Sequence, residues 1–86
     1  MTRDELRDVV VAELARVAPE LDPTALRLDA PLRDQIDLDS MDFLNVIIAL
    51  HDRVGVEIPE ADYSNLSSVG AIVAYLDAKL TGRRAP

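Results

Sequence analysis

Cysteine and tryptophan are absent from this chain of 86 residues, and it contains only three glycines and three aromatic residues. Without cysteine there is no disulfide, no zinc–thiolate site and no thiol nucleophile within the chain. Three scattered glycines form no glycine-rich loop for a phosphate group, and three aromatic rings form no platform for stacked bases. These absences exclude thiol enzymes, nucleotide-binding loops and aromatic nucleic-acid modules.

Basic residues are also scarce, with nine Lys and Arg against sixteen Asp and Glu, for a net charge of −7. Phosphate backbones and anionic lipid headgroups repel such a polyanion, so we expect no nucleic-acid partner and no membrane partner. The longest apolar run, residues 71–76, is too short to span a bilayer, and the first residues contain no apolar signal segment. We therefore expect a cytoplasmic protein.

Apolar residues recur at helical spacing in three segments. The first helix is predicted to begin at Thr2 with a capping box and to end before Pro19. The second is predicted over residues 40–54, with Asp39 as its N-cap and Gly55 as its C-terminal stop.

The third helix is predicted to begin after Ser67 as N-cap and to stop at Gly82, and a short helical turn is expected after Pro59. A long connection, residues 18–39, precedes the second helix. Five of its apolar residues are spaced to reach a core: Leu21, Leu26, Leu28, Leu32 and Ile36.

No segment alternates as a strand does, so the fold class is all-α. The sequence predicts a small right-handed bundle of three main helices plus one short helix. Residues 1–82 are expected to form a single domain, and residues 83–86 a short flexible tail.

The negative charge is concentrated in residues 29–62, which contain nine acidic residues and only two arginines. The rest of the chain has no net charge. Such a cluster is either a solvated face or a docking surface for basic partners, because complementary charge steers association. The nine acids are Asp29, Asp34, Asp37, Asp39, Asp42, Asp52, Glu57, Glu60 and Asp62.

The predicted second helix carries two apolar stripes. The wider stripe is the expected core face, and it contains Phe43, Val46, Ile47, Leu50 and Val54. The narrower stripe contains Met41, Leu44 and Ile48. Either the long connection folds over this second stripe, or the stripe is an exposed protein-binding strip rimmed by acids.

The sequence contains no residue pattern that predicts catalysis by this chain itself. The single histidine, His51, lies eleven residues after Ser40 on the same predicted helix, about 16 Å along its axis, so the two cannot form a dyad. The acids do not follow the spacing of a calcium loop. A chain this small also cannot enclose a deep cleft. We expect neither catalytic residues nor a metal site, and therefore no enzyme.

The segment Asp39-Ser40-Met41-Asp42 resembles the Asp-Ser-Leu motif of acyl carrier proteins, in which the serine receives 4′-phosphopantetheine from coenzyme A. The resemblance extends over nearly the whole chain, and includes the order helix, long loop, helix and the later Val56-Glu57-Ile58-Pro59. It implies a discrete carrier in which Ser40 bears the covalent 4′-phosphopantetheine. The thiol of that arm would carry acyl groups as thioesters in a fatty-acid, polyketide or related specialised pathway.

The resemblance also implies partners and roles for further residues. The partners are a phosphopantetheinyl transferase and enzymes that load or process acyl groups through basic patches, and the carrier is expected to be a monomer. The motif residues beside Ser40 would be Asp39, Met41 and Asp42. The residues that dock partner enzymes would be Leu44, Ile48, Asp52, Glu57 and Glu60. The residues lining an acyl pocket would be Val46, Leu50, Val54, Ile58 and Ala71.

Four positions depart from the family pattern. Asp37 stands where members often have Gly and Met41 where they often have Leu, and Asn45 and His51 stand where fatty-acid carriers commonly have Glu. These departures favour partners other than the ordinary fatty-acid enzymes. Two alternatives stay open: a peptidyl or aminoacyl carrier, although Asp37-Leu38 replaces the Gly-Gly common there, and an unmodified helical adaptor.

Overall fold

A computed structural model of the chain describes the backbone of residues 1–84 and the side chains of residues 1–82. Within this part every regular element is helical, as the apolar spacing predicts: α1 (Arg3–Val17), η1 (Leu32–Asp34), α2 (Ser40–Val54), η2 (Glu60–Asn65) and α3 (Val69–Arg84). The three α-helices and the short helix η2 confirm the predicted all-α class. The 3₁₀ turn η1 was not predicted. Among the helices of residues 1–84, none is long and apolar enough to cross a membrane.

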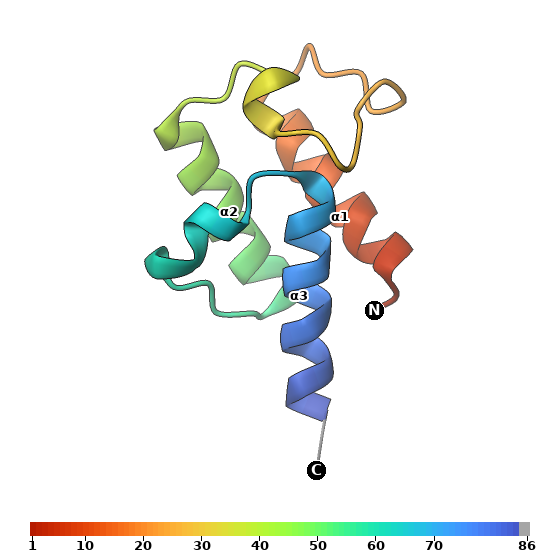
Figure 1. Cartoon of the computed structure of the whole chain (residues 1–86), viewed down its shortest axis with the longest axis vertical. Helices are drawn as coiled ribbons and strands as arrows, with labels where there is room; N and C mark the ends of the chain where they lie inside the picture. The colour runs from red at the N-terminus through yellow and green to blue at the C-terminus, as the bar shows by residue number, and fades with distance from the viewer. Residues whose placement is uncertain (85–86) are drawn as a thin grey trace.

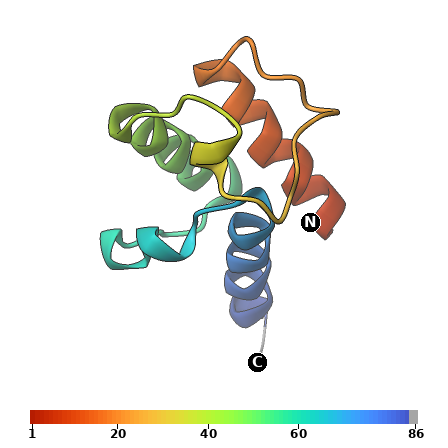
Figure 2. The same cartoon turned by 45° about the horizontal axis from the view of Figure 1, so that its top comes forward.

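Helix α1 packs against both α2 and α3 (Figures 1 and 2). Its start is the predicted capping box, in which the backbone N–H of Glu5 donates to the Thr2 hydroxyl and that of Thr2 donates to the Glu5 carboxylate. The hydrogen bond from the Thr2 N–H to the carboxylate, and secondly the Thr2 side chain, lower the pKa of Glu5 below its ordinary value. Leu6, Val10 and Leu14 are fully buried and begin the core.

Helix α2 has the bounds that its local signals predict. The Asp39 side chain accepts a hydrogen bond from the N–H of Asp42 at 2.8 Å, which caps the first turn. Gly55 ends the helix with φ at 75°, a left-handed conformation that costs other residues more than glycine. Its buried residues Val46, Ile47 and Leu50 confirm the predicted core face.

Helix α3 corrects both of its predicted ends. The capping side chain is Ser68, whose hydroxyl accepts from the N–H of Ala71 at 3.1 Å, and not Ser67. The helix continues through Gly82 to Arg84, so the predicted stop at Gly82 is wrong. Residues 85 and 86, the end of the predicted tail, lie outside the described residues.

The long connection between α1 and α2 is tied to the rest of the fold through its backbone. Leu32 donates its N–H to the carbonyl of Ser67 at 2.7 Å, and Gly70 donates its N–H to the carbonyl of Leu28 at 2.8 Å. The Gln35 side-chain amide also links two parts of the connection by hydrogen bonds. It bonds to the N–H and the carbonyl of Arg27 and to the carbonyl of Ala30.

The apolar residues of this connection meet the core to different extents. Leu32 is buried, while Leu21, Leu26 and Ile36 are partly buried against the core. Leu28 is 42% exposed, so its predicted core position is wrong. At Leu28 the fold uses the backbone carbonyl and leaves the side chain outside.

Candidate functional site

Ser40 is the first residue of α2 and lies exposed on the surface. Among the described residues its hydroxyl has no hydrogen-bond partner. In the same turn the N–H of Asp42 is capped by Asp39 and that of Phe43 bonds to the Asp39 carbonyl. The N–H groups of Ser40 and Met41 have no partner in the part of the chain that the structure describes. The helix thus presents a free hydroxyl beside the positive end of its dipole.

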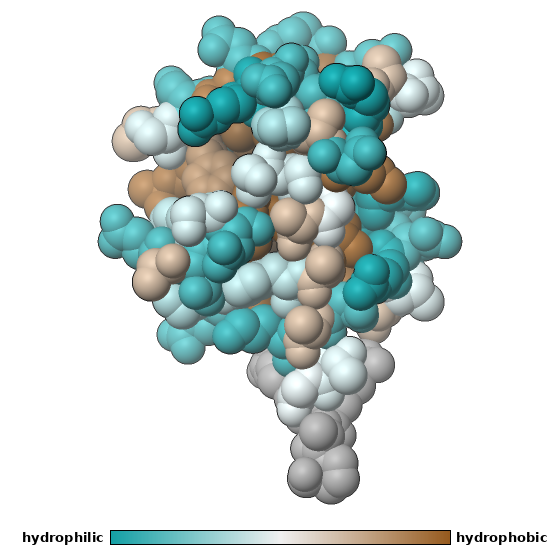
Figure 3. Space-filling model, in the orientation of Figure 1, coloured by the Kyte–Doolittle hydropathy of each residue, from teal (hydrophilic) through white to brown (hydrophobic). Residues whose placement is uncertain are grey.

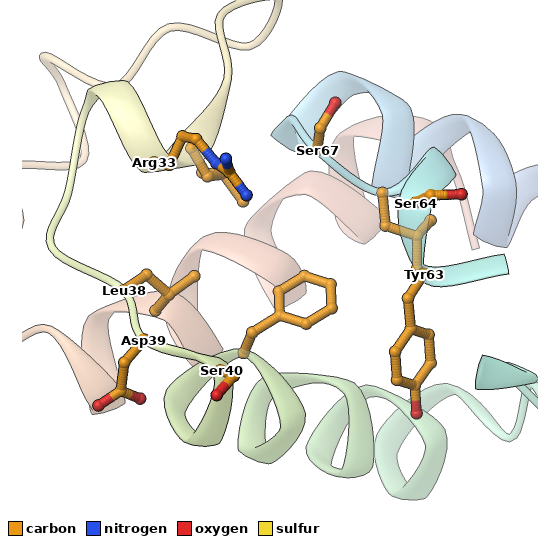
Figure 4. Close-up of a pocket in the computed structure, with 10 residues that line it drawn as sticks. Arg33, Leu38, Asp39, Ser40, Tyr63, Ser64 and Ser67 are labelled. Atoms are coloured by element: carbon orange, nitrogen blue, oxygen red, sulfur yellow. The ribbon is translucent and has the colours of Figure 1, made fainter. Parts of the chain in front are cut away.

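A pocket of about 330 Å³ opens beside Ser40 (Figure 4). Its walls come from the end of the long connection, the start of α2, the short helix η2 and the turn before α3. In Figure 4, Arg33 lies on the upper side of this space and Ser40 on the opposite, lower side, with its hydroxyl turned away from Arg33. The pocket is lined by Leu32, Arg33, Leu38, Asp39, Ser40, Phe43, Tyr63, Ser64, Leu66 and Ser67.

Two aromatic rings form one wall of this pocket. Phe43 from α2 and Tyr63 from η2 meet edge to face, with ring centroids 5.8 Å apart and an interplanar angle of 77°. Such pairs are favoured because the positive edge of one ring faces the negative face of the other. The contact joins α2 to η2 at the lining of the pocket.

The second apolar stripe of α2 is open to solvent. Met41 is 64% exposed, Ile48 51% and Leu44 37%, which decides between the two alternatives: the strip is exposed and the long connection does not cover it. Figure 3 shows an apolar patch over the first half of α2, surrounded by hydrophilic residues. The predicted acidic neighbours Asp39, Asp52, Glu57 and Glu60 are exposed and Asp42 is half-buried.

The five residues predicted to line an acyl pocket lie in or beside the core. Val46, Leu50 and Ile58 are buried, and Val54 and Ala71 are half-buried. The pocket beside Ser40 is lined by none of them. Their role with a bound acyl chain therefore stays a prediction.

The structure adds residues that the sequence did not single out for this site. Arg33, Tyr63, Ser64 and Ser67 line the pocket, yet they follow no local motif and come together only through the fold. His51 is exposed. Its Nδ1 lies 3.0 Å from the carbonyl oxygen of Val56, which places the ring at the end of α2, away from the pocket.

Comparison with known proteins gives the site a context. Residues 4–76 match a family model described as "Phosphopantetheine attachment site". The chain is 34% identical over 74 residues to an acyl carrier protein of Campylobacter hominis, a match that covers 86% of this chain and 87% of the relative. The chain belongs to the acyl carrier protein family.

Other relatives agree with this membership. An acyl carrier protein of Rhodococcus erythropolis is 30% identical over 81% of this chain and 80% of its own length. A meromycolate extension acyl carrier protein of Mycolicibacterium smegmatis is 29% identical over 81% of this chain and 74% of its own length. Acyl carrier proteins carry substrates for enzymes and are not themselves catalysts, and membership implies a covalently attached 4′-phosphopantetheine.

Proposed function

We propose that Ser40 is the attachment residue for 4′-phosphopantetheine, and that this carrier delivers acyl thioesters between enzymes of a fatty-acid, polyketide or related specialised pathway. The observation that supports this most directly is the exposed, unpartnered Ser40 hydroxyl at the first residue of α2. That serine lies within the Asp-Ser motif and within the matched residues 4–76.

The donors around Ser40 suit the group it would hold. The unbonded N–H groups of Ser40 and Met41 face an attached phosphodiester at the positive end of the helix dipole. When bound, the arm supplies the thiol that the cysteine-free chain lacks. In the transfer, Ser40 Oγ would lose its proton to a base of the transferase and bond to phosphorus as the phosphoanhydride of coenzyme A breaks, and adenosine 3′,5′-bisphosphate would leave.

The face around Ser40 suits a protein partner. The exposed strip Met41, Leu44 and Ile48 offers apolar contact area next to the attachment residue. The exposed acids Asp52, Glu57 and Glu60 would attract the basic patches of the transferase and of acyl-handling enzymes. We place the carrier in the cytoplasm as a monomer, with residues 1–82 as its functional domain.

The test is modification of the intact chain. The parent, Ser40→Ala and Ser64→Ala are each incubated with coenzyme A and a phosphopantetheinyl transferase, and their intact masses are measured. Ser64 is a matched control because it is an exposed serine that lines the same pocket. We expect the parent and Ser64→Ala to gain one phosphopantetheinyl group and Ser40→Ala to gain none.

The two contrary outcomes mean different things. An unmodified parent would overturn the carrier function and leave the unmodified helical adaptor. A modified Ser40→Ala variant would show that another hydroxyl is the attachment residue.

A further inference from the structure

Arg33 is the one Lys or Arg of the acidic segment, residues 29–62, whose charge is not paired by any described residue. The segment contains nine acids and two arginines, Arg33 and Arg53. Arg53 is engaged, because its guanidinium lies 3.2 Å from the buried carboxylate of Glu13. The guanidinium of Arg33 has neither an ion pair nor a hydrogen bond within the described part of the chain. The segment therefore presents one positive charge that the fold leaves unneutralised.

This charge stabilises no contact of the described chain itself. Arg33 belongs to the turn η1, in which Leu32 is the buried residue and the Arg33 side chain is exposed. Three acids stand close to it in the sequence, Asp34, Asp37 and Asp39. None of their carboxylates lies within ion-pair distance of the guanidinium. The positive charge of Arg33 is therefore available to a partner.

Arg33 lies beside the surface that a partner must meet to reach Ser40. The two residues line the same pocket of about 330 Å³ from opposite sides (Figure 4). The exposed apolar strip begins at the next residue along α2, Met41. Exposed charges act on each other over about 10 Å at 0.1 M salt and farther at lower salt. Arg33 thus influences the docking of a partner without having to touch it.

A partner whose patch consists only of Lys and Arg meets two opposite effects on this face. The exposed acids Asp52, Glu57 and Glu60 attract such a patch, while Arg33 repels the part of it that comes next to Ser40. A partner with a carboxylate at that place is attracted by both. Specificity is a difference between affinities, and a repulsive element lowers the affinity of the wrong partner. One unpaired charge therefore separates these two classes of partner.

We infer that Arg33 is a selectivity residue of the docking face. It favours enzymes that place a carboxylate within their basic patch near Ser40, and it slows enzymes whose patch is uniformly basic. This inference rests on the proposed function, because it takes Ser40 as the residue that the partner must reach. It adds the charge pattern of the partner, which the acidic residues of the face alone leave open.

The test measures phosphopantetheine transfer to the full chain. The probe is a phosphopantetheinyl transferase selected for a carrier-facing patch of Lys and Arg without carboxylates, and kcat/KM is compared at low salt for the parent, Arg33→Gln and Arg33→Glu. We expect kcat/KM to rise about twofold in Arg33→Gln and about fourfold in Arg33→Glu, the effects of removing and of reversing one unit charge about 10 Å away in water. Both increases should shrink as salt is raised, whereas an effect of side-chain shape would not respond to salt.

Arg27 provides the matched control. It is an exposed arginine on the same connection, and it is not part of the lining of the pocket beside Ser40. Its neighbours Leu26 and Leu28 line a different hollow, against α1. Arg27→Gln and Arg27→Glu make the same changes in net charge as the Arg33 variants, and their kcat/KM should stay close to that of the parent.

The preference for a carboxylate is tested by changing the transferase. Each Lys and Arg of its patch is replaced by Glu in turn, and every transferase variant is assayed with the parent chain and with Arg33→Glu. We expect at least one transferase variant to modify the parent faster than Arg33→Glu, which reverses the order seen with the original transferase.

Equal rates for the parent and both Arg33 variants would overturn the inference, as would slower transfer to Arg33→Glu by the original transferase. Equal increases in the Arg27 variants would also overturn it, because net charge would then account for the effect, and so would a set of transferase variants of which none prefers the parent. None of these results touches the proposed function. That function fails where intact mass shows no arm on the parent after prolonged reaction, which is measured before any rate is compared.

Discussion

The hydroxyl of Tyr75 on α3 donates a 2.6 Å hydrogen bond to the carboxylate of Asp62 on η2. The helix η2 contributes no fully buried residue of its own, so such contacts decide where it lies. On its other side Tyr63 meets Phe43 of α2. Two side-chain contacts thus hold η2 between α2 and α3, and with it one wall of the pocket beside Ser40.

Removing the Tyr75 hydroxyl should loosen this anchor. We expect Tyr75→Phe to lower the free energy of unfolding by about 0.5–1.5 kcal/mol, the usual net contribution of one hydrogen bond. Urea denaturation measures the change. Because the ring itself is retained, a larger loss would mean that Tyr75 stabilises the fold by something other than the bond to Asp62.

The same bond makes stability depend on alkaline pH. Burial, and secondly the hydrogen bond and the charge of Asp62, raise the pKa of Tyr75 from its ordinary value of 10.0 to about 12. Because the folded state holds this proton more tightly, the stabilisation is complete below pH 10 and is lost as pH rises towards 12.

We therefore expect the stability of the parent to fall more steeply over this interval than that of Tyr75→Phe. Tyrosinate absorbance during a pH titration of Tyr63→Phe, in which Tyr75 is the remaining tyrosine, should show the raised pKa directly. A midpoint near the value of a free tyrosine would contradict the assignment.

Gly70 marks the place where the long connection approaches α3 most closely. A Cβ at this position would lie 2.9 Å from the carbonyl oxygen of Leu28, a backbone atom that cannot turn aside. Gly70→Ala should therefore destabilise the fold by about 1–3 kcal/mol, as overpacked core positions do. Gly82→Ala is the matched control on the same helix, because its added Cβ meets nothing within 4 Å. It should be neutral or stabilise by up to about 1 kcal/mol through better helix propensity. Equal destabilisation of the two variants in urea denaturation would contradict the close approach.

Local signals explain why some features could be predicted and others could not. The bounds of α2 follow from Asp39 and Gly55, which act within a single turn of the chain. At α3 the sequence analysis predicts Ser67 as the cap, and Ser68 is its neighbour in the chain. The structure distinguishes them through a distant residue, since the carbonyl of Ser67 accepts the N–H of Leu32 while the hydroxyl of Ser68 caps the helix.

The functional site likewise has one part that the sequence predicts and one part that depends on the tertiary fold. Ser40 and its exposed strip lie on one helix and could be read from that helix alone. The pocket is different, because Arg33, Phe43 and Ser64 come from three elements that only the tertiary fold brings together. The buried Glu13 is another such case, since its partner Arg53 is forty residues away.

Glu13 is the buried charge of the α1–α2 interface. Its side chain is 3% exposed and accepts hydrogen bonds from Arg16 on its own helix and from Arg53 on α2, at 3.3 and 3.2 Å. Glu13→Gln keeps the shape but removes the charge that both guanidinium groups contact. We expect a loss of about 1–3 kcal/mol in the free energy of unfolding by urea denaturation. Glu20→Gln, an exposed glutamate on the connection, is the control and should change stability little. A parent-like Glu13→Gln would show that the two arginines do not stabilise the interface.

The acidic rim of the strip on α2 should govern the rate at which the carrier meets its transferase. Glu57 is exposed beside the end of α2, whereas Glu20 is an exposed acid at the start of the long connection, outside the cluster of residues 29–62. Charge reversal in Glu57→Lys should lower kcat/KM for phosphopantetheine transfer by about fivefold at low salt, because it replaces attraction to a basic patch with repulsion. The difference from the parent should shrink as salt is raised, since exposed charges are screened beyond about 10 Å at 0.1 M. Glu20→Lys makes the same change in net charge and should stay close to the parent. If both reversals slowed transfer equally, net charge would account for the effect, and Glu57 would have no place in a docking face.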